Sequence, residues 1–440
     1  MSAGNDKMME NIKDAETWLE RGDDFVKSKE FDKALDCFTR AIGINPRLSF
    51  AYFKRGNTYN NIGVYDSAIA DLSSSISLNP TFAFAYFKRG SAYLSLNDVK
   101  TAFEDFNKAL DLNPSFSFAL YKRGLCRLRV RDYKEAVEDF SKAIKLNPGL
   151  NLAYVSRGNL YFEKTEYDKA IADYNEAIKI EPDQEKVYIS RGLAHSHTDK
   201  IVEAMRDFTK AINANNESYL GHNYRGLAFL KMKEYANAIK DFNESIRINP
   251  NFADAYNNRG ITYFTVRKYQ EASDDYAQAL KLNPSSPNIY YNRGNTYLVQ
   301  KRYMEAMHDF DFALQLSPGL ASAYISKANC HIALEQFREA IKLFNRAIAL
   351  KPKLFSAYIG RGNTFMRLKL YKKALEDFTL AIEIKPDNHQ GYLNRGMAFK
   401  SDNQIDLASQ DFKKYLESVP SKSPQAVKIR QWLKKMDIEI

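Results

Sequence analysis

The stretch SFAYFKRGNTYNNIGVYDSAIADLSSSISLNP, residues 49–80, decides the fold. Its first half places Tyr52, Gly56 and Tyr59 at i, i+4 and i+7, which is the spacing of one face of an α-helix. The pattern predicts a helix from about Ser49 to Asn61. Glycine weakens a solvent-exposed helix, so its presence here indicates that a neighbouring element approaches closely.

The second half of the same stretch predicts a second helix, from about Asp66 to Leu78. Ala68, Leu72 and Ser75 share one face of it. Pro80 has no backbone N–H and cannot continue a helix, so the second helix must end before it. The unit is therefore a helical hairpin.

This hairpin repeats along the chain with a period of 34 residues. Prolines recur at residues 46, 80, 114, 148, 182, 250, 284, 318, 352, 386 and 420, with Asn216 at the one omitted position. Glycines recur at 22, 56, 90, 124, 158, 192, 226, 260, 294, 362 and 396, each after an arginine, and Lys327-Ala328 is the exception. Alanine occupies all twelve equivalent positions from Ala34 to Ala408. A fixed period of this length predicts an all-α solenoid of twelve hairpins rather than three globular domains.

Composition excludes several other classes of protein. The 440 residues are 45% hydrophobic and 27% charged, as in folded water-soluble chains. No stretch approaches the roughly 18 apolar residues of a membrane helix, and the amino terminus lacks a secretory signal. Three cysteines exclude a disulfide framework and favour a reducing compartment, so we expect a cytoplasmic protein. The net charge of +10 is a mild bias towards acidic partners.

The repeated motif resembles the tetratricopeptide repeat. The pattern is an aromatic residue, Arg-Gly, a second aromatic residue, then Ala, an aromatic or Leu four residues later, a small residue and Pro. The first unit carries Trp18, Gly22, Phe25, Ala34, Phe38, Ala41 and Pro46. The resemblance covers over nine-tenths of the chain and implies a right-handed superhelix of helix-turn-helix units. His195, Asn216 and His222 depart from the pattern and predict a local irregularity.

The two ends are expected to differ from the repeats. Residues 1–14 are predicted to form a flexible lead-in, and residues 15–420 hold the twelve repeats. Within residues 421–440, a capping helix is predicted, with Val427, Trp432, Leu433 and Met436 able to cover the last hairpin.

Arginine precedes the repeat glycine where the family usually has leucine. Sixteen residues after it stands an aspartate in ten repeats: Asp71, Asp105, Asp139, Asp173, Asp207, Asp241, Asp275, Asp309, Asp377 and Asp411. We call these pairs the Arg–Asp ladder. The two positions have similar heights on facing helices, which predicts ion pairs within the hairpin or to the next one. The alternative is a row of guanidinium groups directed at a ligand.

Positions that vary between repeats are free to carry specificity. A stripe of such positions lies on the first helix, away from Tyr52 and Gly56. It consists of Phe50, Phe53, Lys54 and Asn57, then Phe84, Phe87 and Lys88, then Phe118, Tyr121 and Lys122. First helices line the concave groove in the resembled family, which implies that an extended peptide with apolar and acidic side chains binds there. The alternative is that some of these rings pack on the preceding hairpin.

Further along the chain this stripe becomes polar. It contains Asn258, Asn292, Asn295, Asn329, Asn363 and Asn394. Asparagine side chains can hydrogen-bond the backbone of a ligand without reading its sequence, and the superhelix of O-GlcNAc transferases is similar in this respect. The alternative is that these residues make the groove polar without binding anything.

A second candidate site is basic. Residues 341–375 hold nine basic residues and no acidic one: Lys342, Arg346, Lys351, Lys353, Arg361, Arg367, Lys369, Lys372 and Lys373. Such a region favours an acidic protein surface, a nucleic acid or anionic lipid. A solvated basic surface without a ligand is the alternative.

Known chemical motifs are missing. The carboxylate clamp that binds heat-shock proteins would need its first lysine at Phe53, Phe87 or Tyr121, so no complete clamp is present. No metal-binding or phosphate-binding motif occurs, and no catalytic residue or cofactor is predicted. Cys126 and Cys330 are expected in the core, whereas Cys37 replaces a ladder aspartate and is expected to be partly exposed.

The sequence therefore predicts a non-catalytic scaffold or adaptor that binds a peptide or an elongated protein partner. One alternative is a nucleic-acid or polyanion binder that uses residues 341–375. The other is a structural component along a cytoskeletal polymer.

Overall fold

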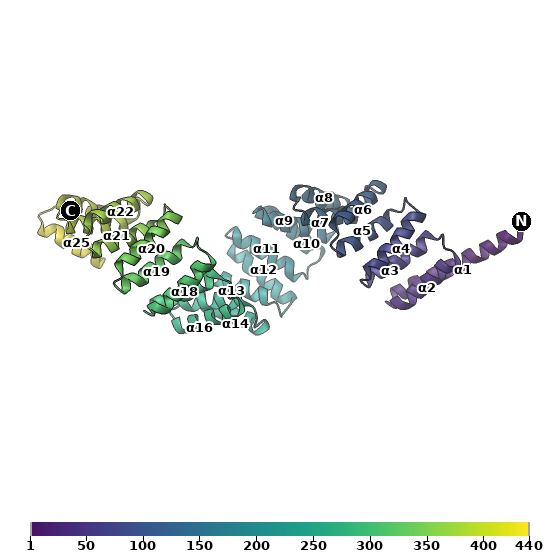
Figure 1. The fold of residues 1–440 in the computed structure, drawn as a ribbon, viewed down its shortest axis with the longest axis horizontal. Helices are drawn as coiled ribbons and strands as arrows, with labels where there is room; N and C mark the ends of the chain where they lie inside the picture. Colours follow the sequence, from purple (N-terminus) through teal and green to yellow (C-terminus); the bar gives the residue numbers. More distant parts are fainter. Residues whose placement is uncertain (1, 439–440) are drawn as a thin grey trace. The chain divides into compact units, whose positions relative to one another are not determined.

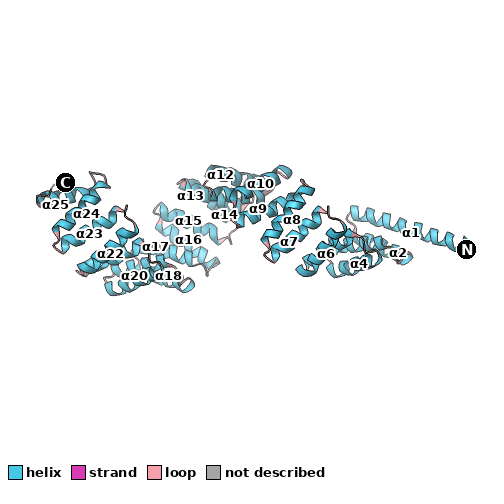
Figure 2. Cartoon of the chain, turned by 90° about the horizontal axis from the view of Figure 1, so that it is seen from above, coloured by secondary structure: helices cyan, strands magenta, loops and turns pink. Residues whose placement is uncertain are grey.

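The computed structural model describes residues 2–438, and this part of the chain contains 25 helices and no strand (Figure 1, Figure 2). It divides into two compact units, Met1–Asn216 and Glu217–Ile440. The division falls directly after Asn216, which occupies the omitted proline position. Each unit contains six hairpins, and the second unit has one additional helix.

The first unit begins with α1 and ends with α12. Its hairpins are α1 (Ser2–Lys27) with α2 (Phe31–Ile44), α3 (Ser49–Asn61) with α4 (Tyr65–Leu78), α5 (Ala83–Ser95) with α6 (Val99–Leu112), α7 (Ser117–Arg129) with α8 (Tyr133–Leu146), α9 (Asn151–Glu163) with α10 (Tyr167–Ile180), and α11 (Glu185–His197) with α12 (Ile201–Ala214). Helix α1 runs through residues 2–14, the predicted lead-in.

The second unit begins with α13. Its hairpins are α13 (Tyr219–Lys231) with α14 (Tyr235–Ile248), α15 (Ala253–Thr265) with α16 (Tyr269–Leu282), α17 (Pro287–Val299) with α18 (Tyr303–Leu316), α19 (Ala321–Ala333) with α20 (Phe337–Leu350), α21 (Phe355–Arg367) with α22 (Tyr371–Ile384), and α23 (His389–Ser401) with α24 (Ile405–Glu417); α25 (Pro424–Lys435) follows.

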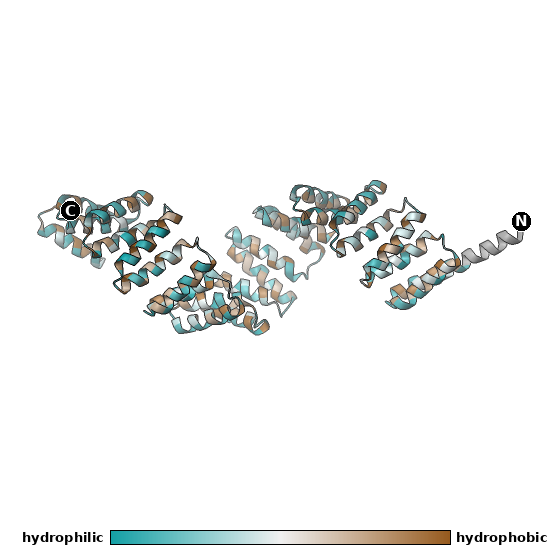
Figure 3. Ribbon diagram, viewed as in Figure 1, coloured by the Kyte–Doolittle hydropathy of each residue, from teal (hydrophilic) through white to brown (hydrophobic). Residues whose placement is uncertain are grey.

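The prediction of tandem helical hairpins is confirmed, and the expected bounds of α3 and α4 agree with the structure to within one residue. Within each unit a helix contacts its partner and the next helix, and successive first helices such as α3 and α5 also touch. Apolar and polar residues alternate around individual helices (Figure 3). Each hairpin therefore buries one face against its neighbours, as expected for a solenoid.

Small residues allow the two helices of a hairpin to pack closely. All twelve repeat alanines from Ala34 to Ala408 are fully buried. The repeat glycine lies under the side chain four residues beyond that alanine, so that a Cβ at Gly124 would stand 2.6 Å from Cε1 of Phe140. At Gly56 and Gly90 a backbone oxygen is also close, at 3.2 and 3.1 Å. In most hairpins an aromatic ring, more than the opposite backbone, therefore requires glycine.

The turn inside each hairpin has a left-handed residue. Its φ is 80° at Gly63 and between 57° and 64° in the other repeats. The residues are Lys29, Gly63, Asn97, Arg131, Thr165, Asp199, Lys233, Arg267, Lys301, Glu335, Lys369 and Asn403. The conformation recurs with the 34-residue period although only one of the twelve residues is glycine.

Helix α25 covers the last hairpin. Ala426, Ile429 and Leu433 are buried on it, and the Trp432 ring meets the Phe412 ring edge to face at 5.3 Å. Ser423 caps its amino terminus by accepting a hydrogen bond from the backbone N–H of Ala426.

Candidate partner-binding site

The Arg–Asp ladder joins the two helices of ten hairpins. In each, the arginine Nε and one terminal nitrogen donate to the two carboxylate oxygens of the aspartate, as Arg89 does to Asp105 at 2.9 and 2.8 Å. The prediction of ion pairs is confirmed. The aspartates are at most 9% exposed, so these pairs are desolvated and geometrically defined.

In eight of these pairs the remaining terminal nitrogen of the arginine also donates to a side chain of the preceding repeat. Arg123 donates to Asn107, and Arg157 donates to Ser141, both at 2.8 Å. In the repeat without the arginine, Lys327 instead pairs with Asp311 of the preceding repeat. The ladder thus joins the two helices of ten hairpins and links most of them to the preceding repeat. Because the guanidinium donors are used inside the protein, the ladder does not form a ligand-binding row.

The first helices of unit one expose a row of large apolar side chains. Phe50, Phe84 and Phe118 are 44%, 48% and 46% exposed, and Leu152 occupies the same position in the next repeat at 55%. We call these four residues the apolar row. Leu152 was not predicted as a site residue, although its place in the 34-residue period could have indicated it.

The other predicted aromatic residues of the stripe turn towards the core. The Phe87 ring lies 6.0 Å from that of Phe106, and the Tyr121 ring 5.8 Å from that of Phe140. Phe53 packs against Phe82 with ring centroids 4.7 Å apart. These three rings are thus largely engaged inside the protein, and Phe53 also stacks on Phe50 of the apolar row, with ring centroids 5.8 Å apart.

The predicted lysines lie beside the apolar row but differ in their partners. Lys54 forms an ion pair of 2.9 Å with Asp23 of the preceding first helix and lies over the Phe50 ring. Burial lowers the pKa of both Lys88 and Lys122, and no ion pair joins either lysine to a carboxylate in the described part of the chain. Lys88 and Lys122 are therefore half-buried cations that lack a counter-charge.

Two hollows lie between successive first helices at equivalent positions, one in each unit. The first, of about 220 Å³, is lined by Asn159, Phe162, Glu163, Tyr174, Ser190 and Leu193 of α9, α10 and α11. The second, of about 330 Å³, is lined by Ile261, Phe264, Tyr276, Tyr291, Asn292, Asn295, Leu298 and Val299 of α15, α16 and α17. Both lie over the only two repeats in which tyrosine replaces the core phenylalanine, a signal the sequence interpretation did not use.

The predicted asparagines are not equivalent. Asn292 and Asn295 line the second hollow together, and the Asn292 amide donates to Asn257 at 3.2 Å. Asn329 and Asn363 are exposed on the next first helices. The Asn258 side-chain amide donates a hydrogen bond to Oδ1 of Asn223 in the preceding repeat, at 3.0 Å. Part of the asparagine row is therefore available to a ligand, and part holds neighbouring repeats together.

The basic residues of 341–375 do not gather at one place. Lys342 and Arg346 lie on α20, and Lys351 and Lys353 in the α20–α21 loop. The α21–α22 turn holds Arg367, Lys369, Lys372 and Lys373. It lies at the opposite end of α21 from the α20–α21 loop, and α21 is about 20 Å long. Lys342 pairs with Glu339, and Arg361 belongs to the ladder. The region forms separate basic clusters.

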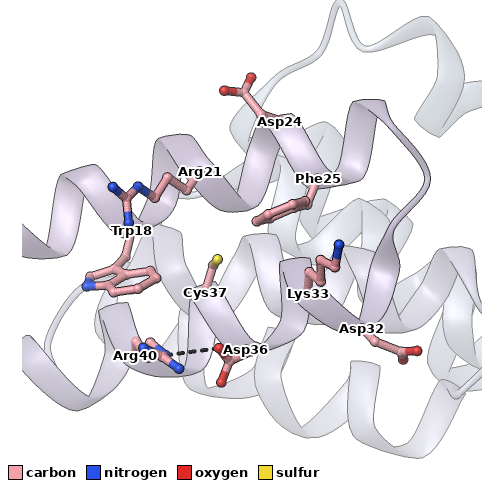
Figure 4. A pocket seen from close by; sticks show the side chains of 9 residues that line it. All are labelled: Trp18, Arg21, Asp24, Phe25, Asp32, Lys33, Asp36, Cys37 and Arg40. Atoms are coloured by element: carbon pink, nitrogen blue, oxygen red, sulfur yellow. Dashed lines mark ion pairs between the residues drawn. The ribbon is translucent and has the colours of Figure 1, made fainter.

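A pocket of about 710 Å³ opens at the first hairpin, between α1 and α2 (Figure 4). Trp18, Arg21 and Phe25 line it from α1, and Cys37 and Arg40 from α2. In eight later repeats the equivalent arginine donates to a side chain of the preceding second helix. The expectation that Cys37 is partly exposed is wrong: its side chain is 3% exposed because it fills the interhelical ladder position, and burial raises its pKa. Cys126 and Cys330 are buried as expected.

The described residues contain no group of three or more His, Cys, Asp or Glu side chains arranged to hold a metal ion. Among them, no helix combines the length and the apolar character that crossing a membrane requires.

The fold and its exposed first-helix face define an α-solenoid of stacked helical hairpins, a class built for extended binding surfaces. Sequence profiles of the tetratricopeptide repeat match residues 51–82, 83–116, 117–150, 253–286, 287–320, 321–354 and 355–388, and a further profile of this repeat matches 158–197 and 226–266. Together the matches cover more than half of the chain. The chain belongs to the tetratricopeptide repeat family, whose members generally serve as protein-interaction scaffolds, and no enzyme family is indicated.

No curated protein sequence gave a significant match. Among solved structures, the chain is similar to yeast Tom70, at 16% identity over 97% of this chain and 96% of that chain with a TM-score of 0.45. It is also similar to the APC/C hetero-tetramer Cut9–Hcn1, at 13% identity over 95% and 96% with a TM-score of 0.50. MamA shares 30% identity over 38% of this chain and 96% of its own, with a TM-score of 0.35. At these identities and coverages the likeness concerns the fold alone.

Proposed function

We propose that this protein is a non-catalytic scaffold that holds an extended segment of a protein partner against its first helices. The observation that carries the proposal is the apolar row, in which four successive repeats of unit one expose a large apolar side chain at the same position. A contiguous series of exposed apolar side chains is uncommon on a soluble surface unless a partner covers it.

The spacing of the row suits a polypeptide in an extended conformation. Neighbouring helices pack about 8–10 Å apart, and an extended chain rises about 3.3 Å per residue. Roughly three ligand residues would therefore span one repeat. The hollows at α9–α11 and α15–α17 offer further places for side chains along the same kind of surface.

Photo-crosslinking tests the proposal. With p-benzoylphenylalanine placed at position 118 or 152, a bound partner should crosslink at both positions through one short, continuous segment of its sequence. Phe118→Ser/Leu152→Ser should reduce capture of this partner by at least tenfold. The matched control is Val130→Ser/Val202→Ser, because Val130 and Val202 are exposed apolar residues of the same unit outside the row.

Equal loss with both double variants would contradict the proposal, as would crosslinks scattered over a folded partner surface. Capture of a nucleic acid that is lost with Lys372→Ser/Lys373→Ser would favour the rival polyanion-binding function. Each variant should first show a helical melt like that of the unmodified protein.

A further inference from the structure

Three lysines stand at the same position of successive first helices. Lys54, Lys88 and Lys122 each follow a phenylalanine of the apolar row by four residues, so each lies on the same side of its helix as that phenylalanine. In the first case Asp23, one position after the repeat glycine of the preceding helix, forms an ion pair with Lys54 at 2.9 Å. The carboxylate therefore comes from the neighbouring first helix.

At the next two steps this carboxylate is replaced by an uncharged side chain. Asn57 occupies the position of Asp23 relative to Lys88, and Ser91 occupies it relative to Lys122. Oδ1 of Asn57 is buried and has no hydrogen-bond partner. The Ser91 hydroxyl donates to the backbone oxygen of Phe87 at 2.8 Å. Neither residue supplies the negative charge that Asp23 gives to Lys54.

Burial and like charge both act on the two unpaired lysines. Desolvation lowers the pKa of Lys88, and the nearby charge of Lys122 lowers it further. Desolvation also lowers the pKa of Lys122, to which the charge of Arg129 contributes. Two neighbouring, partly desolvated ammonium groups repel each other, and an anion placed between them would reverse this cost.

The surroundings favour a short acidic element over a long polyanion. Lys54 is already neutralised by Asp23, and Glu163 lines the hollow between α9 and α11. The uncompensated charge near the apolar row is thus limited to Lys88, Lys122 and the neighbouring Arg129, whereas a nucleic acid presents phosphates continuously along its length. The flanking Phe84 and Phe118 suit apolar side chains.

We propose that Lys88 and Lys122 together bind the carboxylate of an aspartate or glutamate in the extended segment, while apolar residues on either side of that acid rest on Phe84 and Phe118. This inference rests on the proposed function, since it assumes that a peptide lies along the first helices. Beyond the proposed function, it specifies that the ligand carries an acidic residue with apolar residues on either side. Lys88 and Lys122 occupy a helix position other than that of the lysines in the heat-shock-protein carboxylate clamp.

Selection from a displayed library of random 12-residue peptides tests both the proposed function and this inference. The full chain should enrich peptides with one or two acidic residues between apolar residues. Lys88→Met/Lys122→Met should lose the enrichment of acids and keep that of apolar residues, and Lys88→Glu/Lys122→Glu should select basic residues instead. Lys108→Met/Lys142→Met is the matched control, because these lysines have the same 34-residue separation and lie exposed on second helices.

Fluorescence anisotropy with one labelled peptide from this selection measures how much the two lysines contribute to the binding affinity. Replacing both lysines by methionine should weaken its binding roughly 10- to 100-fold, as should Glu→Gln in the peptide, and added salt should weaken binding to the unmodified protein.

The outcomes separate the two proposals. Enrichment of apolar peptides without acids would overturn this inference and leave the proposed function standing. No enrichment at all, or enrichment insensitive to Phe118→Ser/Leu152→Ser, would overturn the proposed function and with it this inference. Binding more than tenfold tighter to a phosphoserine peptide, or to a 12-nucleotide single-stranded RNA, would overturn the choice of a carboxylate.

Discussion

Asp139 is the ladder aspartate that pairs with two arginine side chains. It is fully buried, accepts two hydrogen bonds from Arg123, and forms an ion pair of 2.8 Å with Arg127. Asp139→Ala would leave the partly buried guanidinium group of Arg123 without its carboxylate, and Arg127 would keep only the longer ion pair with Glu135, at 3.5 Å. We expect the α7–α8 hairpin to lose about 3–5 kcal/mol of local stability, measurable as faster amide hydrogen exchange in these helices.

An exposed ion pair of the same unit is the control for this prediction. Glu176 and Lys179 are 46% and 69% exposed, so Glu176→Ala should cost less than about 1 kcal/mol. If both substitutions changed exchange equally, the ladder would not be a stabilising element.

Gly124 is required by the ring above it. Gly124→Ala would place a Cβ 2.6 Å from Cε1 of the fully buried Phe140, so the ring or the helix must shift, at about 1–3 kcal/mol. At Gly43, on α2, a Cβ would meet no neighbouring atom within 4 Å. Gly43→Ala should therefore stabilise the protein by about 0.4–1 kcal/mol. Thermal unfolding, monitored by circular dichroism, should show a lower midpoint for Gly124→Ala and a higher midpoint for Gly43→Ala. A similar loss of stability in both variants would contradict the ring-contact explanation.

At the scale of the helical hairpin, the left-handed turn is a point of strain. Thr165 adopts φ 60° between α9 and α10, although a β-branched residue is disfavoured in this region. Thr165→Asn should raise the midpoint of thermal unfolding, because asparagine tolerates the left-handed conformation.

The reverse change is available at the equivalent turn of the second repeat. Gly63 has φ 80° there, and Gly63→Thr should destabilise the α3–α4 hairpin by about 1–2 kcal/mol. Matching changes in the same direction at both turns would show that φ does not control their stability.

At the scale of the whole molecule, a solenoid needs its terminal apolar surface covered. Leu433 of α25 is fully buried against the last hairpin, near Phe412. Leu433→Ala should cost about 2–5 kcal/mol and release α25. Hydrogen exchange should then quicken in α23 and α24, with little change in the first unit, because each repeat is stabilised by its neighbours.

Val427 lies on the same helix and is 40% exposed. Val427→Ala should leave hydrogen exchange in α23 and α24 nearly unchanged. Uniform loss of protection over the entire chain with Leu433→Ala would contradict nearest-neighbour stabilisation.

The candidate site was only partly predictable from the stripe of variable residues. Its spacing indicated which side of the first helices differs between repeats. It did not distinguish Phe84, which is exposed, from Phe87, three residues later, whose ring packs near Phe106. Both positions lie within one helical stripe, and the Phe87 ring is covered by Phe106 of the same hairpin and Phe116 of the next one.

The sequence by itself determined the hairpin, its period and its number of repeats, because proline, glycine and alanine act through local backbone chemistry and close contact. It also indicated the ladder, since positions sixteen residues apart lie at similar heights in any such hairpin. Only the tertiary structure decided that the arginine also reaches the preceding repeat, that Cys37 is buried, and that the basic residues of 341–375 separate. It alone showed that Asp23 neutralises Lys54 while Lys88 and Lys122 stay unpaired. The burial of Cys37 depends on contacts inside its own hairpin, and the separation of the basic residues depends on where the helices begin and end. The arginine contacts and the pairing of Lys54 depend on contacts between side chains of neighbouring repeats, and such contacts arise only when the repeats stack.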